Sequence, residues 1–244
     1  MKQLIIFLIL FFTLNIGISQ NELYILLDNS YINKDNDSLN CFFDLWEQDS
    51  NYNNNTNQGN SSSDTINDII NLYSAFINSF ENEIHENYSE YFIVQNLLIW
   101  EFDELCFDSK TKQYFYFKDS IVDFKPNILL KNRKVLYSIP KYTNVIKTFL
   151  GDQNAADNLM APNVPILDTK SRNEWIDNKV KVYLSHWGDY WNIESEPYII
   201  KIELKNTSDS ANILYSYRYS GGHALFKKVN NKWILIKRNK YFIE

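Results

Sequence analysis

Residues 197–236 read PYIIKIELKNTSDSANILYSYRYSGGHALFKKVNNKWILI and carry the clearest structural pattern of the chain. Side chains at alternate positions are apolar along 199–204 and again along 211–219, which is typical of strands with one buried face. Asn230-Asn231 suits a two-residue hairpin turn because asparagine tolerates positive φ. Gly221-Gly222 is interpreted as a tight reversal. The segment therefore predicts a four-stranded antiparallel meander.

Apolar residues at helical spacing predict helices before this meander. They cover 22–32, 37 or 38 to 46, 63 or 64 to 80, 142–150 and 173–187. Runs rich in aromatic and β-branched residues predict strands over 91–102, 114–117, 121–124 and 135–139. The fold class is α+β, with N-terminal helices and an antiparallel sheet, then a C-terminal helix and the meander.

The domain organisation has two alternatives. We expect one α+β domain over 20–244, and the alternative is two small α+β domains over 20–130 and 140–244. Pro126, Pro140 and the basic cluster at 131–134 are the features that would mark a linker between them. Residues 50–63 are rich in Asn and Ser and predict a flexible loop. Residues 152–171 predict a long connection, either a surface strap or a lid.

Residues 1–19 have the pattern of a secretory signal peptide. Lys2 precedes an apolar run over 4–14, and Gly17 and Ser19 place small residues before a cleavage point at Gln20. The run is shorter than the roughly 20 residues of a spanning helix. We therefore expect an exported protein, periplasmic or secreted, with no membrane anchor after leader cleavage.

Composition limits the partners. The net charge of −6 argues against nucleic acid, whose binding depends on basic surfaces. The 17 Tyr, 16 Phe and 6 Trp indicate a globular, aromatic-rich protein and leave a small apolar ligand or a partner protein as candidates. Cys41 and Cys106 are the two cysteines, and whether they pair is open.

A resemblance rests on the C-terminal part, about residues 185–244. The run HWGDYW at 186–191, YSGG at 219–222 and KW at 232–233 resembles the tail of secreted, uncharacterised bacterial proteins. The meander after helices is also similar to the cone-shaped nuclear-transport-factor-like fold. That fold hosts ketosteroid isomerases, dehydratases and binding modules, so the likeness implies no single function.

One group of residues could support catalysis. His186 lies close in sequence to Asp189 and Glu194, and a histidine beside a carboxylate can act as a general acid or base. The structural alternative is a helix end whose aromatic side chains pack against the sheet, and we favour it. These three residues are therefore weak catalytic candidates.

Aromatic residues and a second histidine suggest a ligand site. The weak candidates are Trp187, Tyr190, Trp191, Tyr217 and His223. No spacing of ligands indicates a metal site, and no glycine-rich phosphate loop or nucleophile motif indicates a cofactor or an acyl enzyme. We therefore expect a soluble, non-enzymatic ligand-binding or protein-interaction module. The alternative is a small hydrolase, isomerase or dehydratase that uses His186 with Asp189 or Glu194.

Overall fold

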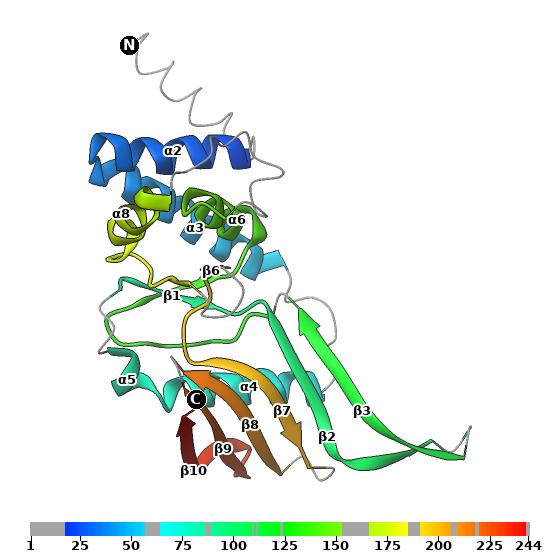
Figure 1. Cartoon of the computed structure of the whole chain (residues 1–244). Coiled ribbons are helices and arrows are strands. Elements are labelled where there is room, and N and C mark those ends of the chain that lie inside the picture. Colours follow the sequence, from blue (N-terminus) through cyan, green and yellow to red (C-terminus); the bar gives the residue numbers. More distant parts are fainter. Residues whose placement is uncertain are drawn as a thin grey trace, which may run out of the picture.

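The protein has an α+β fold in which a six-stranded sheet lies below a layer of helices (Figure 1). A computed structural model describes residues 18–56, 64–85, 89–108, 110, 112–122, 124–152, 166–184, 191–205, 209–217 and 220–242. The described helices are α2 (Gln20–Asn33), α3 (Asn36–Thr56), α4 (Asp64–Asn78), α5 (Glu81–His85), α6 (Pro140–Phe149) and α8 (Ile166–Ile176). None of them is both long and apolar enough to cross a membrane.

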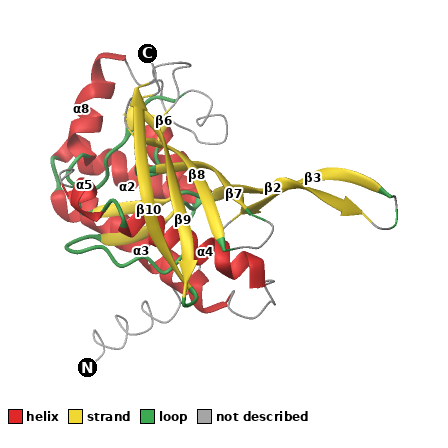
Figure 2. Cartoon of the chain, turned by 90° about the horizontal axis from the view of Figure 1, so that it is seen from below, coloured by secondary structure: helices red, strands yellow, loops and turns green. Residues whose placement is uncertain are grey.

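The strands form one large sheet and two small ones. They are β1 (Tyr91–Val94), β2 (Leu97–Asp108), β3 (Gln113–Val122), β4 (Lys134–Tyr137), β5 (Tyr183–Leu184), β6 (Trp191–Asn192), β7 (Tyr198–Leu204), β8 (Ser210–Tyr217), β9 (Ser220–Val229) and β10 (Lys232–Phe242). The large sheet has the order β10-β9-β8-β7-β2-β3, and β1-β4 and β5-β6 are two-stranded pairs. In Figure 2, β2 and β3 extend beyond the rest of the sheet as a two-stranded arm.

The predicted meander is confirmed as β7 to β10, each strand antiparallel to the next. Asn230 and Asn231 form the last turn with φ of 50° and 59°, as the hairpin requires. The sequence pattern does not predict the next pairing, in which β7 lies parallel to β2, with Trp100 opposite Ile202. Strands from both sides of residues 126–140 therefore share one sheet.

The inner face of the sheet packs on α4, and we call the buried residues between them the sheet core. Tyr215 of β8 lies 5.3 Å from Phe76 and 5.2 Å from Phe80 between ring centroids. The sheet core includes Ile213 on the same strand and continues to Ile202 of β7 and Phe226 of β9, all buried. The apolar stripe expected on the 63–80 helix is the α4 surface that covers the sheet.

A second cluster, the helical core, lies among α2, α3, α6 and the strand β1. Its centre is Trp46 of α3, fully buried and stacked on Tyr142 of α6 at 5.3 Å between ring centroids. Phe43 stacks on Tyr91 of β1 at 5.4 Å. The Trp46 indole N–H donates to the Tyr137 carbonyl at 2.9 Å, so the helical core is also tied to β4.

The prediction of a helix over 173–187 is wrong, because α8 ends at Ile176. The backbone N–H groups of Lys179 and Val180 both donate to the Ile176 carbonyl, at 2.8 and 3.0 Å, and close a turn. β5 follows at Tyr183. The residues after the turn, Val180 to Tyr183, are rich in β-branched and aromatic side chains, which favour strands over helices. The helical spacing to residue 184 was coincidental, and Trp187 lies outside the described residues.

Residues 91–102 form two strands rather than one. Gln95 separates them, because its side chain accepts from the Ile199 N–H at 2.9 Å and donates to the Leu97 and Ile199 carbonyls. β1 pairs in parallel with β4, whereas β2 enters the large sheet. Conversely, the two strands expected at 114–117 and 121–124 are one continuous strand, β3, which ends at Val122.

Two further expectations differ from the structure. Residues 50–56 continue α3, where the composition predicted a loop over 50–63; residues 57–63 lie outside the described part. Gly221 and Gly222 lie inside β9 and make no reversal. A Cβ on Gly222 would stand 2.4 Å from the Tyr215 ring and 2.5 Å from the Asn239 carbonyl oxygen, so glycine lets Tyr215 pack there.

Candidate ligand-binding site

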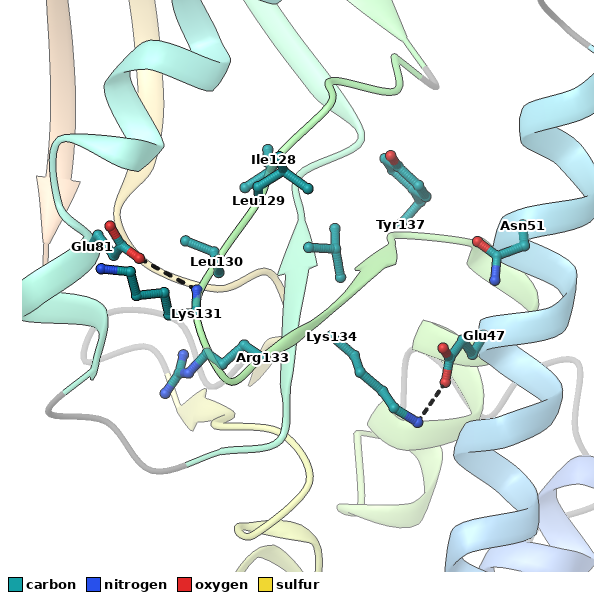
Figure 3. Close-up of a pocket in the computed structure, with 11 residues that line it drawn as sticks. Glu47, Asn51, Glu81, Ile128, Leu129, Leu130, Lys131, Arg133, Lys134 and Tyr137 are labelled. Carbon is teal, nitrogen blue, oxygen red and sulfur yellow. Dashed lines mark hydrogen bonds and ion pairs between the residues drawn. The ribbon is translucent and has the colours of Figure 1, made fainter.

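The candidate site is an open cavity where the sheet core and the helical core meet. Its volume is about 570 Å³, and we call it the junction cavity. The described lining residues are Glu47, Asn51, Glu81, Ile128, Leu129, Leu130, Lys131, Arg133, Lys134, Val135 and Tyr137. Most belong to the segment 128–137, which runs into β4, and α3 and α5 supply the others (Figure 3).

The segment is fixed at several points along its length. Ile128 is buried in the sheet core, and the Tyr137 hydroxyl donates to the Pro126 carbonyl at 3.1 Å. The Lys131 N–H donates to Glu81 Oε1 at 3.3 Å. Asn132 has a φ of 59°, which turns the chain into β4. These contacts leave Leu129 79% exposed, the most exposed large apolar side chain among the described residues.

One end of the cavity holds a paired lysine. Lys134 Nζ lies 2.9 Å from Glu47 Oε2 and 3.7 Å from Glu90 Oε1. The hydrogen bond with Glu47 raises the pKa of Lys134. Burial, with the nearby Glu90 carboxylate, raises the pKa of the Tyr91 hydroxyl to about 12, so Tyr91 stays neutral and hydrogen-bonds to Glu47 at 3.4 Å.

The other end holds an arginine without such partners. Arg133 lies there beside Lys131 and Glu81 (Figure 3). Its Nη2 is enclosed by the protein and has no hydrogen-bond acceptor, and no carboxylate in the described part of the chain pairs with the guanidinium. Burial lowers the pKa of Arg133, although an arginine stays protonated in proteins. Among the described residues, Arg133 is therefore a cation of the cavity lining without a carboxylate partner, and one of its nitrogens has no hydrogen-bond acceptor.

The catalytic candidates are only partly described. His186 and Asp189, with Trp187 and Tyr190, lie outside the described residues. Glu194 is partly buried and accepts a hydrogen bond from the Ser138 hydroxyl at 3.3 Å. Glu194 therefore lies beside Ser138, the residue directly after the cavity segment, and no histidine among the described residues pairs with it.

The remaining candidates lie in three different places. Trp191 is buried in the helical core. Tyr217 is buried in the sheet core beside Phe80, and its hydroxyl donates to the Glu83 carbonyl at 3.3 Å. His223 is exposed on the opposite face of the sheet. Tyr217 and His223 therefore do not share a site.

His223 belongs to a row of polar side chains across the outer face of the sheet. Lys201 lies 2.7 Å from carboxylate oxygens of both Glu101 and Glu203, and Asn212 donates to Glu203 at 2.8 Å. Asn212 Nδ2 is 3.3 Å from His223 Nδ1. Burial opposes ionisation of Glu203, but the hydrogen bonds from Lys201 and Asn212 outweigh it and lower its pKa. The row is satisfied internally.

Two other predictions concern metals and cysteines. Across the described ranges, no group of three or more His, Cys, Asp and Glu side chains could hold a metal ion. Cys41 is a free, exposed thiol on α3.

The junction cavity was not predicted from the sequence. Its signal was present as ILLKNRK at 128–134, an apolar run followed by a basic cluster, which we interpreted as a linker feature.

Comparisons with protein-family models, with curated proteins and with solved structures each found no match. The resemblance of residues 185–244 to secreted bacterial proteins therefore stays a prediction.

Proposed function

We propose that this protein is an exported, non-enzymatic binding module whose ligand occupies the junction cavity. The single observation that carries the proposal is an open cavity of about 570 Å³ that combines exposed Leu129 with unsatisfied Arg133. Small-molecule sites are typically apolar hollows of about 300–1,000 Å³ with a few placed polar groups. The inner face of the sheet is not the site, because α4 covers its aromatic side chains.

The lining residues support binding rather than catalysis. Among those that the structure describes there is no histidine, cysteine or serine. The two carboxylates are engaged, Glu47 with Lys134 and Glu81 with the Lys131 N–H. The alternative, a small hydrolase, isomerase or dehydratase, depends on His186 with Asp189 or Glu194, and no described contact favours it, because His186 lies outside the described residues.

Export is supported by the leader pattern of residues 1–19. We expect protein recovered from the exported fraction to begin at Gln20, as intact-mass measurement would show. A mass that includes Met1 to Ser19 would contradict this part of the proposal and leave the binding part intact.

Binding is tested by thermal unfolding of the exported protein with a panel of carboxylates, phosphates, sugars, alcohols and amines. We expect at least one class to raise the melting temperature with a saturable concentration dependence. Leu129→Trp, which adds bulk at the cavity, should weaken that response. Leu225→Trp is the matched control, because Leu225 is 42% exposed and lies on β9 outside the cavity. No response, or equal responses in both variants, would contradict a ligand site here.

A further inference from the structure

We infer that the junction cavity binds a carboxylate that carries an apolar chain, with Arg133 as the partner of the carboxylate. The inference rests on the proposed function and names its ligand class. Arg133 is the central observation: its partly exposed side chain lines the cavity, and no carboxylate in the part of the chain that is described pairs with it. An arginine charge that no carboxylate balances is available to an anionic ligand, because the guanidinium pairs well with carboxylates.

The charge balance of the cavity favours an anion with one charge. Its lining has three cations, Lys131, Arg133 and Lys134, against two carboxylates, Glu47 and Glu81. Lys134 is already neutralised by Glu47 at 2.9 Å. One monoanion at the Arg133 end would bring the net charge of the lining residues to zero. The planar guanidinium also matches the two oxygens of a carboxylate, which it binds through paired hydrogen bonds.

The apolar part of the ligand follows from the opposite wall. Leu129 is 79% exposed although it stands between Ile128 and Leu130 in the same lining. Val135 also lines the cavity, and Tyr137 lies beyond the three apolar residues (Figure 3). An apolar chain lying against this wall would remove Leu129 from water, while its carboxylate reaches Arg133. A small inorganic anion would leave the wall exposed, so an amphiphilic carboxylate fits better.

The test compares octyl compounds that differ only in the head group. Octanoate, 1-octanol, octylamine and octyl phosphate are titrated into the whole exported protein by calorimetry. We expect octanoate to bind at least tenfold more tightly than octanol and octylamine, and more tightly than octyl phosphate, whose second charge exceeds the local balance. Equal affinities for octanoate and octanol would overturn the inference, as would tighter binding of octyl phosphate.

Variants then assign the charge to one residue. Arg133→Gln should weaken the binding of octanoate at least tenfold and leave the binding of octanol unchanged. Arg133→Lys should weaken the binding of octanoate less. Lys237→Gln is the control, because Lys237 is an exposed cation on β10, outside the cavity lining. Unchanged octanoate binding in Arg133→Gln would overturn the inference. If that variant does not fold, the comparison of octanoate with octanol on the native chain still decides.

The two proposals can fail separately. If octanol and octanoate bind equally and Leu129→Trp weakens both, the cavity is a ligand site and only the carboxylate inference is wrong. If Leu129→Trp changes the binding of no compound in either set, the proposed function itself is wrong.

Discussion

Arg172 and Arg133 are two arginines withdrawn from water in different regions, and the protein treats them in opposite ways. In the helical region, Arg172 Nη1 lies 2.6 Å from Asp28 Oδ1 and its Nε lies 2.7 Å from Asp168 Oδ2. Its guanidinium also lies 5.0 Å from the centre of the Tyr31 ring. At the junction cavity, Arg133 Nη2 has no acceptor among the described residues. The protein therefore places two carboxylates around Arg172 and, among the described residues, none around Arg133.

The difference separates a structural cation from a candidate binding cation. Arg172 joins α2 to α8, since Asp28 and Asp168 lie on those two helices. Arg133 makes no ion pair with a carboxylate in the described structure and lines a cavity instead. The comparison therefore predicts that substitution of Arg172 destabilises the protein, whereas substitution of Arg133 leaves its stability unchanged or raises it.

The largest effect is expected from Arg172→Met. Removing the guanidinium leaves the Asp28 carboxylate, only 17% exposed, without its cation. Breaking a buried ion pair in this way typically costs about 3–5 kcal/mol. Urea unfolding would measure the loss. Arg172→Lys is the matched control, because it keeps the charge without the planar fork and should cost less. A loss under about 1 kcal/mol would mean that the helical region does not depend on this cation.

The next effect is a change in the pH dependence of stability through Asp168. Hydrogen bonds from the Tyr31 hydroxyl, at 2.5 Å, and from Arg172 lower the pKa of Asp168. A carboxylate whose pKa is lowered in the folded state stabilises the fold above its ordinary pKa, and this is lost as pH falls through the folded-state value. The melting temperature of the native protein should therefore decrease when the pH is lowered below about 4.

In Asp168→Asn, the melting temperature should decrease less at low pH than it does in the native protein. At neutral pH, this variant should lower the melting temperature by less than Arg172→Met does. Melting curves between about pH 2 and about pH 7, the range in which carboxylates titrate, would show both effects. An unchanged acid limb in the variant would place the pH dependence in other carboxylates.

Arg133→Met should not lower the stability of the protein. The variant removes an unsatisfied buried donor and keeps much of the apolar length of the side chain. Its free energy of unfolding should be unchanged or higher by about 1 kcal/mol, because replacing an unsatisfied group can stabilise. Urea unfolding without ligand would measure this. A loss of more than about 1.5 kcal/mol would show that Arg133 is structural, as Arg172 is.

The smallest effect is expected from Glu47→Gln, at the paired end of the cavity. Glu47 and Lys134 are 30% and 47% exposed, and pairs as exposed as this contribute about 0–1 kcal/mol. The same unfolding assay at low and high salt would detect the difference, which should shrink as salt rises. A cost above about 2 kcal/mol would mean that the ion pair, rather than packing, holds the cavity wall.

The fold could be predicted from the sequence wherever the pattern was local. The alternation along β7 and β8 and the Asn230-Asn231 turn depend on residues next to each other, and the structure confirms them. The parallel pairing of Trp100 with Ile202 depends on residues far apart in the chain, so no local pattern indicates it. The end of α8 was missed because Val180 and Leu184 continue a helical spacing beyond the turn that stops the helix.

The candidate site was harder to predict than the fold. The basic cluster at 131–134 is visible in the sequence, but its members have different roles. Lys134 is neutralised because α3, far away in the chain, brings Glu47 to it. Nothing described does the same for Arg133. Which cation remains unsatisfied is decided by the packing of distant elements.

The parallel pairing of β2 with β7 also sets an order for folding. The hairpins of β7 to β10 close short loops, and hairpins of this kind form in about 1–10 μs. The sheet is complete only when the strand at Trp100 reaches Ile202, and such distant contacts slow folding. We expect the amide protons of this pairing to exchange with solvent only when the whole domain unfolds, whereas those at the free edge of β10 exchange through local opening.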